Sequence, residues 1–224
     1  MKAPIAIALD APDLATATQW AQATAPYVDT LKVGLETYLR DGAGAIEAVK
    51  ATDARLFLDL KLHDIPNTVA GAARSVARFA PDFLTVHASG GAAMIAAAAK
   101  ELPNTRITAV TILTSLTAED LKSIGYAGEP IEAVTRLARL AVDAGARAIV
   151  CSPMEVAAVR AVVPAEITLI TPGVRPAGAD AGDQARVATP QQALADGADL
   201  VVIGRPITGA SDVASAAREI GASL

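Results

Sequence analysis

The sequence predicts an α/β fold, a single-domain (β/α)8 barrel of the TIM type over residues 1–224, and three observations lead to this prediction. Short runs of branched apolar residues recur along the whole chain, and each is followed by a stretch with helical spacing. About eight such runs in 224 residues give a repeat of about 28 residues, which suits one strand and helix of a barrel. No low-complexity linker or shift in composition divides the chain.

The predicted strands are continuous apolar runs rather than alternating ones. This pattern is typical of parallel strands that have helices on one side and packed side chains on the other. We expect strands at Ile5–Leu9, Thr30–Val33, Leu56–Leu60, Phe83–Val86, Ile107–Ile112, Ala148–Val150, Thr168–Ile170 and Leu200–Ile203. Periodicity by itself does not show that a sheet closes, so a doubly wound open sheet is the alternative architecture.

Helix faces and helix ends can also be predicted between the strands. Apolar residues recur at helical spacing in two segments, at Val69, Ala73, Val76 and Phe79 and at Ile131, Val134, Ala138 and Ala141. Ser152-Pro153-Met154-Glu155 and Thr189-Pro190-Gln191-Gln192 each have a hydroxyl cap, a proline in the first turn and a reciprocal Glu or Gln. Gly145 and Gly197 lie where such helices should end.

Composition excludes several classes of function. The net charge of −5, the pI of about 5.0 and the absence of basic runs argue against nucleic acid as a partner. Mean hydropathy is +0.38, yet no apolar stretch reaches the length of a membrane helix, and the first residues are too short for a signal peptide. We therefore expect a cytoplasmic protein. The only cysteine, Cys151, excludes an intrachain disulfide and is expected to be a small buried hydrophobe.

Charged residues gather at the ends of the first three predicted strands. Asp59 and Lys61 are two residues apart, so on a strand their side chains share one face. Lys32 ends the second strand and Asp10 the first. In a dry pocket, such alternating charges fix the protonation state of each neighbour, which suits the placement of one proton donor. The alternative is a purely structural ring of ion pairs that closes the barrel.

A second group of residues could bind phosphate. Gly204 and Arg205 end the eighth predicted strand, and Gly173, Arg175 and Gln184 belong to the long connection before it. Barrels frequently bind phosphate between the loops that follow strands seven and eight. Two connections, 114–130 and 173–189, are longer than a barrel needs, and the glycines of the second predict a mobile lid.

The charged cluster belongs to a longer motif, Asp59-x-Lys61-x-x-Asp64-Ile65-Pro66-Asn67-Thr68. This motif is the hallmark of the orotidine 5'-phosphate decarboxylase family, whose bacterial form the chain resembles over nearly its whole length. The further signatures follow in the family's order and are Leu9-Asp10, Lys32-Val33-Gly34, Leu113-Thr114-Ser115, Pro172-Gly173-Val174-Arg175, Asp183-Gln184 and Ile203-Gly204-Arg205-Pro206.

The resemblance implies decarboxylation of orotidine 5'-monophosphate to uridine 5'-monophosphate in pyrimidine biosynthesis, without a metal or organic cofactor. It implies that Lys61 protonates C6 of the pyrimidine, and that Asp59, Lys32 and Asp64 hold and tune Lys61. Asp64 is expected to enter the site of a neighbouring subunit in a homodimer. The substrate-binding residues that it implies are Asp10, Lys32, Asp59, Thr68, Thr114, Ser115, Arg175, Gln184, Gly204 and Arg205.

Three alternatives remain open from the residues. The shorter pattern Asp-x-Lys-x-x-Asp also occurs in related barrels such as hexulose-phosphate synthases, so a metal-dependent sugar-phosphate aldolase or epimerase is one alternative. A non-catalytic barrel that binds nucleotide is the second. The third is a metal site that uses His63 and His87, although the chain has only these two histidines. The Ile65-Pro66-Asn67-Thr68 extension and the Thr114-Ser115 step favour the decarboxylase.

Overall fold

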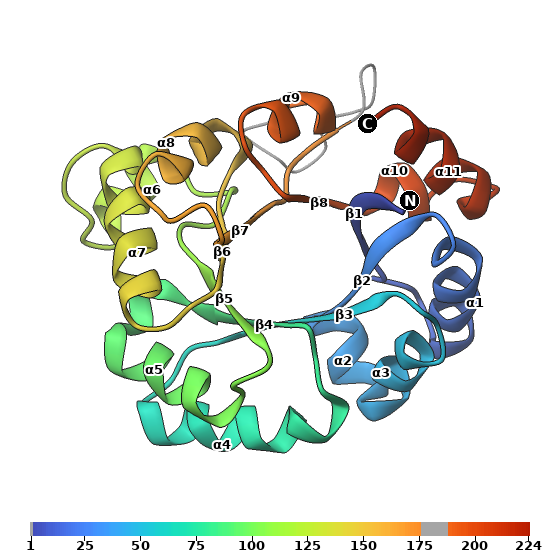
Figure 1. Cartoon of the computed structure of the whole chain (residues 1–224), viewed down its shortest axis with the longest axis horizontal. Coiled ribbons are helices and arrows are strands. Elements are labelled where there is room, and N and C mark those ends of the chain that lie inside the picture. The colour runs from blue at the N-terminus through green and yellow to red at the C-terminus, as the bar shows by residue number, and fades with distance from the viewer. Residues whose placement is uncertain (1, 176–187) are drawn as a thin grey trace.

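The structure, a computed structural model, describes residues 2–175 and 188–224. Eight parallel strands pair in chain order, and the last pairs with the first, so the sheet is a closed barrel (Figure 1). The strands are β1 (Ala3–Ala8), β2 (Val28–Gly34), β3 (Arg55–Leu62), β4 (Phe83–His87), β5 (Arg106–Val110), β6 (Ala148–Val150), β7 (Thr168–Thr171) and β8 (Leu200–Ile203). The predicted (β/α)8 barrel is confirmed, and the open sheet is excluded.

All eight predicted strands are present. The bounds coincide for β6 and β8 and differ by at most two residues at either end for the others. The agreement follows from the apolar runs themselves, because both sides of a barrel strand are covered and nearly every residue along it is buried.

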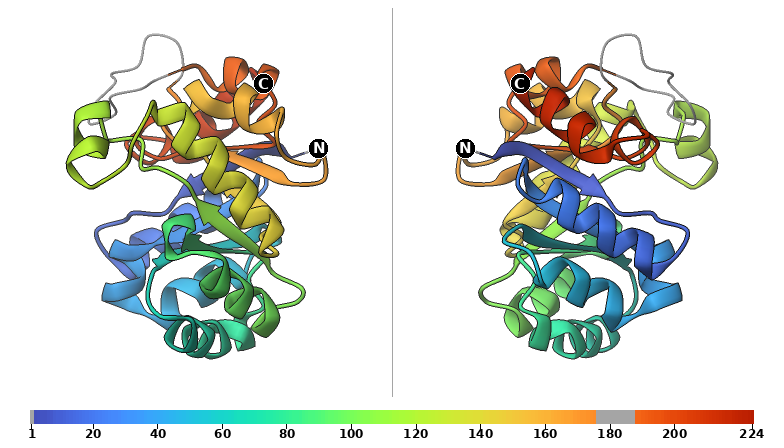
Figure 2. Two further views of the ribbon diagram at one scale, coloured as in Figure 1. Left: turned by 90° about the vertical axis from the view of Figure 1, so that its left-hand side faces the viewer. Right: turned by 90° about the vertical axis from the view of Figure 1, so that its right-hand side faces the viewer.

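The helices form a ring outside the strands (Figure 1). They are α1 (Leu14–Thr24), α2 (Leu35–Asp41), α3 (Ala43–Lys50), α4 (Pro66–Val76), α5 (Ala92–Glu101), α6 (Ala118–Ser123), α7 (Pro130–Asp143), α8 (Val156–Arg160), α9 (Pro190–Ala195), α10 (Arg205–Thr208) and α11 (Val213–Ala222). Helices α1 and α11 come from opposite ends of the chain and lie side by side (Figures 1 and 2). No helix in the described ranges has the length and apolar character that crossing a bilayer requires.

The predicted helix signals are largely confirmed. Val69, Ala73 and Val76 form the buried face of α4, whereas Ile131, in the first turn of α7, is 37% exposed and lies outside that helix's buried set. The Ser152 side chain accepts the Met154 N–H, and Glu155 accepts the Ser152 N–H. The Thr189 cap is also present, with Gln192 as its donor.

Two apolar cores stabilise the barrel. The larger one lies between the strands and the surrounding helices. The smaller one fills the barrel interior and consists of Ala6, Phe57, Phe83, Ala148, Ile170 and Leu200. Its two aromatic rings, Phe57 and Phe83, are tilted against each other with centroids 5.5 Å apart. The barrel is therefore a packed core below a site and not an open pore.

The N-terminal end of the barrel is closed by an aromatic and cationic stack. The guanidinium groups of Arg55 and Arg106 lie 5.1 and 5.6 Å from the centroid of the Phe83 ring. Arg55 also forms an ion pair with Asp29 at the same end of the barrel. The charged groups at this end thus have partners within the barrel wall, and a ligand site is expected at the opposite end.

Both long connections follow the C-terminal ends of strands. The first contains α6, which begins at a capping box formed by Thr117 and Asp120. The second connection, 173–189, was predicted to be a mobile lid, and most of it, residues 176–187, lies outside the described residues.

We expect Phe83→Ala to lower the free energy of unfolding by about 3–5 kcal/mol, because it removes a fully buried ring from the interior core. Urea unfolding followed by circular dichroism measures this change. Phe79→Ala, at a half-buried ring in the 3₁₀ turn after α4, is the matched control and should cost less. Equal losses in the two variants would contradict the packing role assigned to Phe83.

Candidate active site

A cavity of about 530 Å³ opens at the C-terminal ends of the strands. Its floor includes Phe57, which also belongs to the interior core. The other lining residues are Ala8, Asp10, Lys32, Glu36, Asp59, Lys61, Val110, Ile112, Leu113, Thr114, Val150, Pro172, Gly173, Arg175, Val202, Gly204, Arg205 and Thr208. This position and volume are typical of a barrel site for a small ligand.

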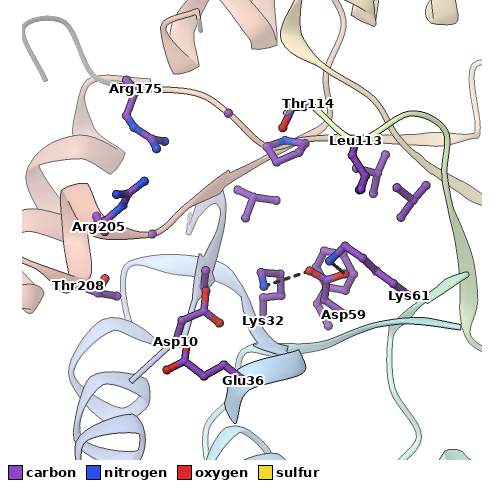
Figure 3. A pocket seen from close by; sticks show the side chains of 18 of the residues that line it. Asp10, Lys32, Glu36, Asp59, Lys61, Leu113, Thr114, Arg175, Arg205 and Thr208 are labelled. Atoms are coloured by element: carbon purple, nitrogen blue, oxygen red, sulfur yellow. Dashed lines mark hydrogen bonds and ion pairs between the residues drawn. The ribbon is translucent and has the colours of Figure 1, made fainter. Parts of the chain in front are cut away.

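The centre of the cavity is the Asp59 carboxylate, which lies between two ammonium groups (Figure 3). Lys32 Nζ is 3.1 Å from Asp59 Oδ2, and Lys61 Nζ donates to Asp59 Oδ1 at 2.8 Å. Burial by itself would raise the pKa of Asp59, but the charges of Lys32 and Lys61 outweigh it and lower that pKa to about 2. Asp59 is therefore ionised throughout the physiological range.

Lys32 is buried between two carboxylates. Burial by itself would lower the pKa of its ammonium, but the charges of Asp59 and Asp10 more than compensate and raise it. Gly34 makes this arrangement possible, because a Cβ there would come within 2.9 Å of both Asp10 Oδ1 and Lys32 Nζ. The Lys32-Val33-Gly34 signature thus combines a charge with the space that the charge needs.

Lys61 lies beside Asp59 as predicted, but regular strand geometry is not the reason. From Leu58 to Leu62, β3 advances four residues while its partner β4 advances only two, from Leu84 to Val86. The strand bulges there, and Lys61 has a φ of 49°, in the left-handed region. The two side chains do lie together, but the predicted reason, the regular alternation of a strand, was wrong.

The far end of the cavity is cationic. Arg175 follows β7 and Arg205 begins α10 after β8, and Figure 3 shows both guanidinium groups facing the cavity. Gly173, with a φ of 78°, and Gly204 line the cavity beside these arginines. The structure therefore brings together the predicted phosphate-binding residues that it describes. Gln184 lies outside the described residues.

Other predicted residues divide into two groups. Thr114 lines the cavity, whereas the exposed Ser115 does not. Asp64 and Thr68 are exposed and do not line the cavity within this single subunit. Asp64 Oδ1 instead accepts the N–H of Ile65 at 2.6 Å.

Two polar lining residues were missed by the sequence analysis. Glu36, in the first turn of α2, adds a third carboxylate near Asp10, and Thr208 lies on the same short helix as Arg205 (Figure 3). Glu36 follows the Lys32-Val33-Gly34 signature by two residues, so its closeness to that signature was the available signal.

The two histidines pack against each other, with ring centroids 5.3 Å apart. Burial, followed by the nearby charges of His63 and Lys61, lowers the pKa of His87. Among the described residues, no group of three or more His, Cys, Asp or Glu could hold a metal ion. Cys151 is fully buried, as expected, and burial raises the pKa of its thiol.

We expect Asp59→Asn to lower the free energy of unfolding by about 3 kcal/mol at pH 7, because two ammonium groups lose their shared counterion. The lowered pKa of Asp59 contributes stability that is complete above its unfolded value of 3.8 and is lost as pH falls towards about 2. The difference in the free energy of unfolding between the wild type and the variant, measured by urea unfolding, should thus be constant from about pH 7 to 5 and become smaller below about pH 4. If this stability difference already began to decline at about pH 6, Asp59 would not be the group responsible.

Comparisons with known proteins agree with this geometry. Residues 3–220 match the model of the orotidine 5'-phosphate decarboxylase / HUMPS family. Orotidine 5'-phosphate decarboxylase from Thermobifida fusca is 65% identical over 100% of this chain and 97% of its own length, and that from Anaeromyxobacter sp. is 57% identical over 98% and 97%. The crystal structure of orotidine 5'-phosphate decarboxylase from Lactobacillus acidophilus superimposes with a TM-score of 0.85, at 33% identity, over 98% of this chain and 97% of that one. The chain belongs to the orotidine 5'-phosphate decarboxylase / HUMPS family.

Proposed function

We propose that Lys61 is the proton donor in the decarboxylation of orotidine 5'-monophosphate to uridine 5'-monophosphate and carbon dioxide. The decarboxylase activity itself is that of the family and of the full-length relatives. The observation that supports the role of Lys61 is its place in the cavity, where the Asp59 carboxylate fixes its ammonium at 2.8 Å. An ammonium held in this way can be aimed at one atom of a bound ligand.

The chemistry needs such a cation. When the bond from C6 to the carboxylate breaks, its electron pair stays on C6 in an orbital in the plane of the ring, which the π system cannot delocalise. A proton from Lys61 Nζ forms the new C6–H bond, and water later returns a proton to the amine. The positive charge of Lys61 stabilises the developing carbanion most strongly where water is excluded.

Asp59 has a second effect in this proposal. Its carboxylate stays ionised, because burial is outweighed by the two lysines that hold its pKa at about 2. A substrate carboxylate placed beside it is repelled and departs as neutral carbon dioxide, so the repulsion is relieved in the transition state. Lys32 balances the charge and keeps Asp59 in place.

The rest of the cavity binds the parts of the substrate that do not react. Arg175 and Arg205 contact the phosphate dianion together with Gln184 and Gly204, and Asp10 and Lys32 contact ribose hydroxyls. Thr114, which lines the cavity, addresses the amide edge of the pyrimidine. Binding energy at the phosphate can then be used to close and order the charged end, which raises turnover as well as affinity.

The working unit in this proposal is a homodimer, in which each subunit is a single domain of residues 1–224. Asp64 and Thr68, which are exposed here, complete the site of the neighbouring subunit. Ile65, which follows Asp64 in the chain, is apolar and 66% exposed, and this exposure favours such an interface.

A metal-dependent sugar-phosphate aldolase or epimerase is the alternative that keeps the barrel and the charged motif. A non-catalytic nucleotide-binding barrel is the other. One assay separates all three, because only the decarboxylase converts orotidine 5'-monophosphate in the presence of a chelator.

Lys61→Ala is expected to lower kcat for orotidine 5'-monophosphate by at least about 1,000-fold, because it removes both the proton and the charge. The wild-type protein in excess EDTA should consume the substrate rapidly, as followed by ultraviolet absorbance, with uridine 5'-monophosphate as product. Circular dichroism and calorimetric titration should show that the variant keeps its fold and its binding of uridine 5'-monophosphate.

Lys100→Ala, at an exposed lysine on α5, is the matched control and should keep full activity. Near-normal turnover in Lys61→Ala would refute the assigned proton donor. A wild-type protein that is inactive with EDTA and active with magnesium and a pentulose phosphate would support the aldolase or epimerase.

Mixed dimers test whether Asp64 is shared between subunits. Lys61→Ala and Asp64→Ala homodimers should both be nearly inactive, whereas a heterodimer of the two, isolated with two affinity tags, should recover about half of the wild-type activity, because one of its two sites has both residues. A heterodimer as inactive as its parents, or a monomer in sedimentation velocity, would contradict the shared site.

A further inference from the structure

The backbone at Lys61 is held in an unusual conformation. Lys61 and Ala80 are the two residues other than glycine with a positive φ in the described ranges, and the value at Lys61 is 49°. A side chain with a Cβ rarely occupies this region, so the surrounding contacts must hold it there. Because β3 bulges between Leu58 and Leu62, ladder pairing with β4 does not supply those contacts.

One buried hydroxyl supplies them. The N–H of Lys61 donates to Thr85 Oγ1 at 2.8 Å, and Thr85 Oγ1 in turn donates to Asp59 Oδ1 at 3.1 Å. The same Asp59 oxygen accepts the Lys61 ammonium at 2.8 Å. Thr85 thus closes a ring of hydrogen bonds that fixes Lys61 at both ends, at its backbone and, through Asp59, at its ammonium.

Thr85 has no place in the cavity itself. It belongs to β4, is fully buried and is absent from the residues that line the cavity. Any effect of Thr85 on the reaction must therefore be exerted through Lys61 and Asp59.

We propose that Thr85 is a positioning residue for the decarboxylation, because its hydroxyl holds the bulged backbone of Lys61 and the Asp59 carboxylate in one geometry. This proposal rests on the proposed role of Lys61. The threonine hydroxyl accepts a hydrogen bond from one group and donates one to the other, whereas valine has nearly the same shape and can do neither. Serine retains both functions.

The barrel offers a matched control in the next strand. Thr108 of β5 is the register partner of Thr85, is also fully buried, and donates to the carbonyl oxygen of Arg106 at 2.9 Å within its own strand. Thr108 does not line the cavity and has no hydrogen bond to Asp59 or Lys61 among the described contacts. Thr108→Val therefore makes the same chemical change as Thr85→Val, but it removes no hydrogen bond to Asp59 or Lys61.

The test compares Thr85→Val, Thr85→Ser, Thr85→Ala and Thr108→Val in steady-state decarboxylation of orotidine 5'-monophosphate. Thr85→Val should lower kcat by about 10- to 100-fold, with KM and the Kd for uridine 5'-monophosphate changed by less than about threefold, because the proton donor is displaced while the binding groups remain. Thr85→Ser and Thr108→Val should stay within about threefold of wild-type kcat.

Thr85→Ser and Thr85→Ala both lose the methyl group and differ only in the hydroxyl, so this pair gives the same comparison if Thr85→Val does not fold. A kcat for Thr85→Val or Thr85→Ala within about twofold of wild type would overturn the proposal. Equal losses in Thr85→Val and Thr108→Val, or in the serine and alanine variants, would also overturn it, because they would indicate only a general loss of packing. Failure of the wild-type protein to decarboxylate the substrate would instead count against the proposed function.

Discussion

The Asp59 carboxylate between two ammonium groups is the interaction on which the rest of the site depends. Lys32 and Lys61 each occupy one of its oxygens, at 3.1 and 2.8 Å. Three charges so close together in a largely buried place are stable only as a set, because each group provides the counterion that its neighbour needs. The set consequently fixes the direction of the Lys61 side chain before any ligand arrives.

The barrel makes this set possible in two ways. Its interior core ends at Phe57, so the charges lie above a dry apolar floor where electrostatic interactions are stronger than in water. The β3 bulge then turns Lys61 out of the ladder and towards Asp59. A regular strand would place the same residues in pairing positions with β4, and the strained backbone at Lys61 is the cost of this rearrangement.

The cavity has two ends with different tasks. Arg175 and Arg205 form a cationic end suited to a dianion, whereas the lysines and carboxylates form an end suited to proton transfer (Figure 3). Separation of binding from chemistry lets energy gained at one end order the other.

The sequence by itself determined the eight parallel strands and placed the Asp59, Lys61 and Lys32 cluster and the two arginines at strand ends, because buried parallel strands appear as apolar runs and their C-terminal ends meet at one face. Closure of the barrel was decided by the pairing of β8 with β1 in the tertiary structure. Only the tertiary structure showed that β3 bulges, that Glu36 and Thr208 line the cavity while Ser115 does not, and that Thr85 connects Lys61 to Asp59. Thr85 is 26 residues from Asp59 and resembles any other strand threonine. Its partners depend on a change of register between two strands, and such a change comes from three-dimensional packing that no local pattern records.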